Sequence, residues 1–167
     1  MEMLFTRDAT TDDVSAMTEI LNSAVRKGFD IWRETPMVVD EMLSSLPNSP
    51  AGKLALRVAV IEAEVVGWAS ISQFKPNYGY EHTAECSVYI SKRHQGKGIG
   101  RQLVDDLYKR AMQIGSIHTL LACIDSENLQ SVRLFTKAGY TQHATLPEVG
   151  HKKGSWRSLH ILVKRVS

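Results

Sequence analysis

The sequence predicts an α/β protein built on one mixed sheet, and three observations point to it. Some short apolar stretches alternate or run together as strands do, and others repeat at the spacing of an amphipathic helix. A glycine-rich stretch lies between one run of each kind. Taken in order, the patterns give a strand, two helices, three strands, a helix, a strand, a helix and two strands.

The N-terminal part predicts one strand followed by two helices. Residues 4–7 are a short strand candidate, and the polar residues 10–13 supply the cap of a helix that stops at Gly28. A second helix is expected over residues 38–46, before a turn rich in proline and glycine.

The middle of the chain predicts three consecutive strands. Two apolar runs, residues 54–61 and 65–74, flank Glu62-Ala63-Glu64 and indicate a tight antiparallel hairpin. After a polar and aromatic loop, the alternating run over residues 84–90 is the third strand. This strand leads into the glycine-rich stretch.

The C-terminal part predicts a crossover unit and a final pair of strands. Helical spacing begins near Arg101 and stops at Gly115, so the next strand is expected to return to the same sheet through one crossover. The remaining strand, helix and two strands are expected over residues 119–124, 128–138, 140–146 and 159–166.

The glycine-rich stretch predicts a binding site for phosphate. Gly96, Gly98 and Gly100 lack Cβ atoms, so peptide N–H groups and the positive end of the following helix can face an anion. Arg101 stands where a nucleoside-triphosphate loop needs Lys followed by Ser or Thr, and the final gap is too short for a dinucleotide fingerprint. We call residues 96–101 the phosphate cradle.

Composition limits the class of protein. A chain of 167 residues fits a single domain spanning residues 1–167, and 20 basic against 18 acidic residues predict no nucleic-acid-binding face. Cys86 and Cys123 are far apart and indicate neither a disulfide framework nor a metal site. With no membrane-spanning run and no signal peptide, a soluble cytoplasmic protein without a membrane partner is expected.

Several motifs together resemble one enzyme superfamily. Arg93-x-x-Gly96-x-Gly98 at a strand–helix junction, with Asn128 and then Gly139-Tyr140 further along, resembles the GCN5-related N-acetyltransferase (GNAT) superfamily. Within it, the chain is most similar to the phosphinothricin and methionine sulfoximine acetyltransferase group, through Trp32-Arg33-Glu34-Thr35-Pro36, Thr83-Ala84-Glu85-x-Ser87-Val88-Tyr89-Ile90, Arg93-His94-Gln95, Ser131-Val132-Arg133-Leu134 and Gly154-Ser155-Trp156.

The resemblance implies both a fold and an activity. The fold is the GNAT acyl-CoA N-acyltransferase fold, with a central, mostly antiparallel sheet of about seven strands and about four helices. The activity is transfer of an acetyl group from acetyl-CoA, without a metal or an acyl-enzyme, to the primary amine of a small amino-acid-like substrate. Relatives also imply a homodimer. A protein or peptide N-acetyltransferase and a non-catalytic acetyl-CoA-binding module are the alternatives.

The implied donor site follows the strand, the cradle and the next helix. The edge of the strand at Val88 would pair with the pantetheine arm of acetyl-CoA, and the cradle would hold the pyrophosphate. Asn128 could bond the same arm or cap its helix, and the two roles are compatible. The cofactor-binding residues so implied are Val88, Tyr89, Ile90, Gln95, Gly96, Lys97, Gly98, Ile99, Gly100, Arg101, Asn128 and Ser131.

Glu85 is the candidate catalytic residue. Amine acetylation needs a neutral amine, so a base must take the proton, and Glu85 lies on the strand that enters the cradle. Its alternative role is an ion pair with a nearby Lys or Arg. Cys86 as a nucleophile is the weaker idea, because neighbours on a strand point to opposite faces. Tyr108 could act as an acid, but its helical spacing favours a place in the core.

The implied acceptor site draws on loops. Lys75 would lie near the substrate carboxylate, or else be a solvated loop lysine, and the loop around Phe29 would either wall the pocket or fold onto the core. The basic hairpin tip at residues 150–156 could reach the site or be a solvated turn. The substrate-binding candidates are Phe29, Trp32, Lys75, Pro76, Asn77, Glu85, Cys86 and Ser87.

Overall fold

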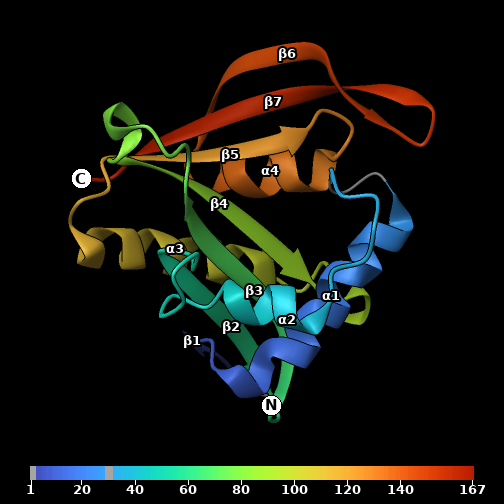
Figure 1. The fold of residues 1–167 in the computed structure, drawn as a ribbon, viewed down its shortest axis with the longest axis vertical. Coiled ribbons are helices and arrows are strands. Elements are labelled where there is room, and N and C mark those ends of the chain that lie inside the picture. The colour runs from blue at the N-terminus through green and yellow to red at the C-terminus, as the bar shows by residue number, and fades with distance from the viewer. Residues whose placement is uncertain (1–2, 29–31) are drawn as a thin grey trace.

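A seven-stranded sheet runs through the computed structural model, which describes residues 3–28 and 32–167 (Figure 1). The strand order is β1-β2-β3-β4-β5-β7-β6, and every neighbouring pair is antiparallel except β4 and β5. The predicted α/β class and order of elements are confirmed. The elements are β1 (Leu4–Asp8), α1 (Val14–Lys27), α2 (Val39–Ser44), β2 (Ala55–Ile61), β3 (Glu64–Gln73), β4 (Thr83–Ile90), α3 (Ile99–Ile114), β5 (Thr119–Asp125), α4 (Leu129–Lys137), β6 (Thr141–Lys152) and β7 (Ser155–Arg165).

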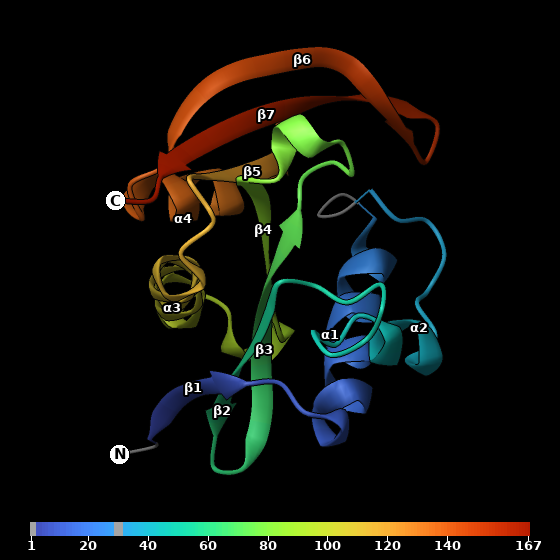
Figure 2. The same ribbon diagram turned by 60° about the vertical axis from the view of Figure 1, so that its left-hand side comes forward.

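Helices cover both faces of the sheet. α1 and α2 pack on one face, and α3 and α4 pack on the other (Figure 2). Alternation along β3 divides its side chains between two cores: Trp68 packs beneath α1, where its indole N–H donates to the Met17 carbonyl at 3.0 Å, and Ala69 packs on the α3 side. The Glu85 face of β4 therefore looks toward α1 and α2.

The two halves of the sheet separate between β4 and β5. Their parallel pairing is limited to Thr83–Glu85 against Thr119–Leu121, and α3 makes the predicted crossover between them. Beyond Glu85, β4 remains paired with β3 on one side only, among the residues that the structure describes. Backbone N–H and C=O groups on the other edge of β4 are thus available to another partner.

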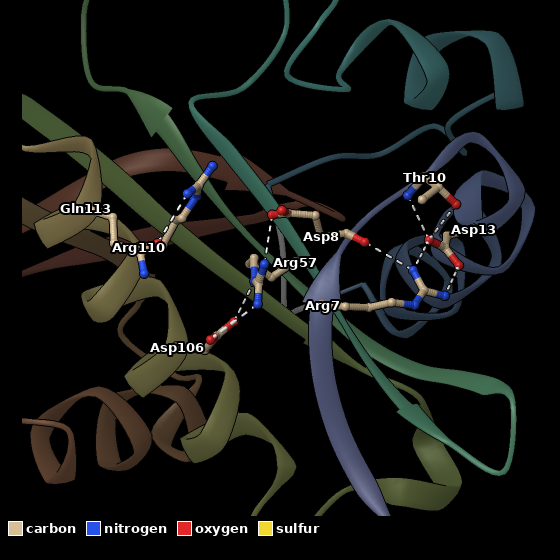
Figure 3. A network of polar contacts seen from close by, with 8 residues as sticks. All are labelled: Arg7, Asp8, Thr10, Asp13, Arg57, Asp106, Arg110 and Gln113. Atoms are coloured by element: carbon tan, nitrogen blue, oxygen red, sulfur yellow. Dashed lines mark hydrogen bonds and ion pairs between the residues drawn. The ribbon is translucent and has the colours of Figure 1, made fainter.

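A polar network ties the N-terminal elements to the rest of the fold (Figure 3). Arg7 on β1 donates two hydrogen bonds, of 2.6 and 2.9 Å, to the buried carboxylate of Asp13, which holds the pKa of Asp13 below its ordinary value. Arg57 on β2 donates to Asp8 at 2.8 Å and to Asp106 on α3 at 2.6 Å. The first pair fixes β1 against the start of α1, and the second fixes β2 against α3.

The β6–β7 hairpin is longer than the sequence predicts. The first strand was expected to end at residue 146 and the second to begin at residue 159. In the structure β6 continues to Lys152 and β7 begins at Ser155, with a turn at Lys153 and Gly154 between them. A register irregularity between Leu146 and Gly150 interrupts the pairing. Pro147 lies inside this irregularity, and proline inside a strand pattern is ordinarily a sign that the strand has ended.

Within the described residues, no helix combines the length and the apolar character that crossing a membrane requires. No three or more His, Cys, Asp and Glu side chains of these residues come together as metal ligands.

Candidate active site

A cavity of about 510 Å³ opens where β4 and β5 separate. Strands β3, β4 and β5 contribute lining residues, and the other lining residues come from the α1–α2 side of the sheet and from α4. The lining residues are Leu21, Trp32, Arg33, Met37, Met42, Ser45, Lys53, Trp68, Ser70, Glu85, Ser87, Val88, Tyr89, Cys123, Ile124, Asp125, Asn128, Ser131 and Phe135. A concave, mostly apolar space with a few polar groups is typical of a small-molecule site.

Glu85 lines this cavity at the last residue of the parallel pairing. It is half-buried, and burial raises the pKa of its carboxyl, while the charge of Lys53 and a hydrogen bond with Cys123 act against that rise. The net direction is upward, toward the range in which a carboxylate accepts a proton from an amine more readily. Glu85 is therefore a carboxylate in the cavity whose pKa is raised by burial, and it remains the candidate proton acceptor.

Lys53 brings a positive charge into the same cavity. Its Nζ donates to the hydroxyl of Ser72 at 2.9 Å, and Ser72 is the residue of β3 directly opposite Glu85. Burial lowers the pKa of Lys53, and the charge of Glu85 raises it. The alternative role of Glu85 was an ion pair with a basic residue. Within residues 3–28 and 32–167, Glu85 has an electrostatic interaction with Lys53 but no ion pair in direct contact.

A second, smaller cavity of about 110 Å³ follows the open edge of β4. Val88, Tyr89 and Ile90 line it, together with Gln95 and with Asn128 and Ser131 of the α4 start. The side-chain amide of Gln95 donates to the Ile90 carbonyl at 3.1 Å and so fixes the end of β4 to the segment that enters the cradle. Residues expected at the donor site are therefore brought together along one edge.

The phosphate cradle forms the turn between β4 and α3. Gly96 and Gly98 have φ values of 75° and 82°, a left-handed conformation that favours glycine, and Gly98 caps α3. The space where a Cβ atom of either residue would lie is open. The first N–H groups of α3 have no acceptor within the helix, so they point to this open space with the positive end of the helix.

Asn128 caps α4, as the sequence predicts. Its side-chain oxygen accepts a hydrogen bond from the backbone N–H of Ser131 at 3.2 Å. Its side chain also borders both cavities, so the cap and a contact with a bound molecule remain compatible.

Some of the residues expected to bind the acceptor line the larger cavity, and one of them, Cys86, does not. Ser87 and Trp32 line the larger cavity, whereas Phe29 lies outside the described residues. Cys86 was expected to bind substrate, and the structure corrects this: its side chain is only 4% exposed and lies in the core on the opposite face of β4, near the hydroxyl of Tyr140. The alternation of strand side chains is the reason.

The loop after β3 lies outside the cavity. Lys75, Pro76 and Asn77 are exposed and do not line it, and the Lys75 ammonium lies 5.4 Å from the centre of the Phe74 ring. Tyr108, for which a core position was favoured, packs partly against the α3-side core, and its hydroxyl donates to the Ser167 carbonyl at 3.3 Å.

Sequence reasoning missed Lys53 and Cys123. Lys53 comes just before β2, and Cys123 lies on β5, so only the assembled sheet brings them to Glu85. The sequence did contain one signal: Lys53 directly precedes an apolar strand, at a place where a lysine can reach along the sheet.

Comparison with known proteins identifies the family. The model of the acetyltransferase (GNAT) family matches residues 17–140. The chain is 35% identical over 153 residues, 92% of its length and 89% of the relative's, to L-methionine sulfoximine/L-methionine sulfone acetyltransferase of Salmonella typhimurium. It is 32% identical over 153 residues, 92% and 82% of the two chains, to phosphinothricin N-acetyltransferase of Streptomyces viridochromogenes.

Solved structures share the whole fold. A Salmonella typhimurium protein solved with its cofactor acetyl-CoA superposes with a TM-score of 0.91 at 33% identity, covering 98% of this chain and 94% of the other. A phosphinothricin acetyltransferase from Sinorhizobium meliloti in complex with acetyl-CoA gives 0.90 at 28% identity, covering 98% and 89%. The chain belongs to the GNAT family of acetyltransferases.

Proposed function

We propose that this acetyltransferase transfers the acetyl group of acetyl-CoA to the amine of a small amino acid or analogue, such as methionine sulfoximine, methionine sulfone or phosphinothricin. One observation carries the proposal: a single strand, β4, leads from Glu85 in the larger cavity, along an unpaired edge, to the phosphate cradle. Relatives named for such amino acids cover most of the chain.

The donor would lie along the open edge of β4. The amide groups of the pantetheine arm would bond the backbone of Val88–Ile90 as an added strand does, and Gln95, Asn128 and Ser131 border the same channel. The pyrophosphate would rest on the N–H groups of residues 96–101. The thioester would then face the cavity that contains Glu85.

The chemistry would use Glu85 as the base. The ammonium of the acceptor transfers one proton to the Glu85 carboxylate, directly or through water, and the neutral amine attacks the thioester carbonyl. The C–N bond forms and the C–S bond breaks. The nitrogen loses its second proton to give the amide, and the departing CoA thiolate takes up this proton, directly or through water. The apolar lining, including Trp32 and Phe135, would exclude water from the thioester.

The test is release of free thiol from acetyl-CoA in the presence of candidate acceptors. The full-length protein is assayed with amino acids, with methionine sulfoximine, methionine sulfone and phosphinothricin, and with short peptides. Saturable release with one or more of the amino acids is expected. Acetylation of peptides but not of free amino acids would instead favour the protein N-acetyltransferase alternative. Binding of acetyl-CoA with no release for any acceptor would favour the non-catalytic module.

The proposal extends to the state of the protein: one catalytic domain over residues 1–167, acting as a cytoplasmic homodimer. Both cysteines are free thiols, which suits a reducing compartment. β6 is an edge strand, and Leu146, Val149 and Trp156 on its hairpin are exposed, which suits a contact with a second copy. Light scattering on the purified protein should give twice the mass of the chain, and a monomer mass would contradict it.

A further inference from the structure

The charged residues of the larger cavity divide into two that are paired and two that are not. Arg33 forms a two-bond ion pair with Glu41, at 2.7 and 2.8 Å. Asp125 likewise accepts two bonds from Arg157, at 2.8 and 2.9 Å. Among the described residues that line the cavity, this leaves the ammonium of Lys53 and the carboxylate of Glu85 without an ion pair.

The two remaining charges lie close together on one face of the sheet. Ser72 and Glu85 are directly opposite residues of β3 and β4, and the side chains of such a pair extend from the same face. The Nζ of Lys53 contacts Ser72 at 2.9 Å, which brings it beside Glu85. The charge of Glu85 raises the pKa of Lys53, and the charge of Lys53 lowers the pKa of Glu85, as expected for neighbouring opposite charges.

Among the described residues, the partly buried ammonium of Lys53 hydrogen-bonds a neutral hydroxyl and has no carboxylate in direct ion-pair contact, so it can bind an anion. A free amino acid carries one negative and one positive group a single carbon atom apart. Lys53 and Glu85 offer the complementary pair of charges. We infer that Lys53 binds the carboxylate of the acceptor amino acid while Glu85 faces its amine. This inference rests on the proposed function.

The consequence is selectivity for free amino acids over amines that lack a carboxylate. A peptide N-terminus has its first carboxyl group tied up in an amide, so it would leave Lys53 without an anion. The exposed Lys75 is the rival for the same role, and it lies outside the cavity lining. Lys53 would therefore be a specificity-determining residue that separates amino acid from peptide acceptors.

The experiment compares each variant with the wild type on two acceptors, methionine sulfone and its carboxamide, which keep the same amine and side chain. Lys53→Met should lower kcat/KM for methionine sulfone about tenfold to a hundredfold, mainly through KM, because a charged hydrogen bond is lost. The carboxamide should change by less than about threefold, since it never contacted the charge. Acetyl-CoA affinity should be unchanged, and Lys53→Arg should retain most of the selectivity.

Matched variants separate the outcomes. Lys109→Met, at an exposed lysine of α3, should change neither acceptor. If Lys53→Met lowered kcat/KM equally for both acceptors, Lys53 would act only through Glu85 or the fold. If Lys75→Met, and not Lys53→Met, lowered kcat/KM selectively for methionine sulfone, the carboxylate would be bound by the loop. Either result overturns the inference. A failure of the proposed function would appear earlier and differently, as a wild-type protein that acetylates no free amino acid.

Discussion

Glu85 is the residue whose substitution tests the chemistry most directly. Glu85→Gln keeps the size of the side chain and removes its ability to accept a proton. We expect kcat/KM to fall about a hundredfold to a thousandfold near pH 7, with acetyl-CoA affinity close to wild type. The loss should shrink as the pH approaches the pKa of the acceptor amine, because a neutral amine needs no base.

The pH profile of the wild type follows from the same residue. Burial raises the pKa of Glu85 above its ordinary value of 4.5, so the acid limb of kcat/KM should lie above that pH. Activity should fall as the pH drops through this pKa, because the carboxylate becomes protonated. Initial rates between pH 5 and pH 9.5 measure the limb, with Glu81→Gln, at an exposed loop residue, as the matched control. An acid limb that persists unchanged in Glu85→Gln would remove Glu85 as the base.

Single residues were predictable where their role is local. Asn128 was expected to cap its helix or to bond the pantetheine arm, and the structure confirms the cap, which depends on residues only three positions apart. Lys53 and Cys123 were not predicted, because their partner Glu85 is distant in the sequence and only strand pairing brings it near. Cys86 shows that a motif can contain a residue whose side chain faces away from the site.

At the scale of one element, α3 has a glycine with similar left-handed backbone at each of its two ends. Gly98 begins the helix with φ 82°, and Gly115 ends it with φ 75°; a Cβ atom would meet no other atom at either place. Alanine at either position should cost about 1 to 2 kcal/mol of stability, because left-handed backbone disfavours a side chain.

Only the N-terminal glycine should affect the donor. Gly98→Ala is expected to weaken acetyl-CoA binding by about tenfold or more. Its methyl group would occupy the space through which a pyrophosphate approaches the backbone. Gly115→Ala should leave the affinity unchanged. Isothermal titration gives the affinity of each variant, and thermal unfolding gives its stability. Equal affinities for the two variants would show that the cradle does not hold the donor.

Elements were predictable where periodicity is regular. The order of strands and helices follows from patterns of alternation and helical spacing, and the stops at Gly28 and Gly115 follow from their left-handed backbone. The β6–β7 hairpin was predicted too short, because Pro147 and Gly150 break the alternation that marks a strand. Pairing with a long partner strand maintained β6 across the irregularity.

At the scale of the whole molecule, the acceptor side joins segments from both ends of the sequence. The separation of β4 from β5 makes the cavity, and Trp32, from the segment between α1 and α2, forms part of its wall. The β6–β7 hairpin reaches this segment, so that a Cβ atom at Gly150 would overlap the indole of Trp32. The resemblance to relatives suggested that the hairpin tip at residues 150–156 could reach the site. No local pattern predicts the particular contact with Trp32, since it depends on how far the hairpin extends.

Gly150→Ala should therefore act on the acceptor and spare the donor. The added methyl group has to displace Trp32 from the wall of the cavity. We therefore expect KM for the amine to rise about three- to tenfold, with little change in acetyl-CoA affinity. Gly154→Ala is the matched control, because it strains the turn of the same hairpin at φ 77° but meets no neighbouring atom. If both variants raised KM alike, the position of the hairpin as a whole would be responsible; if neither did, the contact with Trp32 would have no part in shaping the acceptor site.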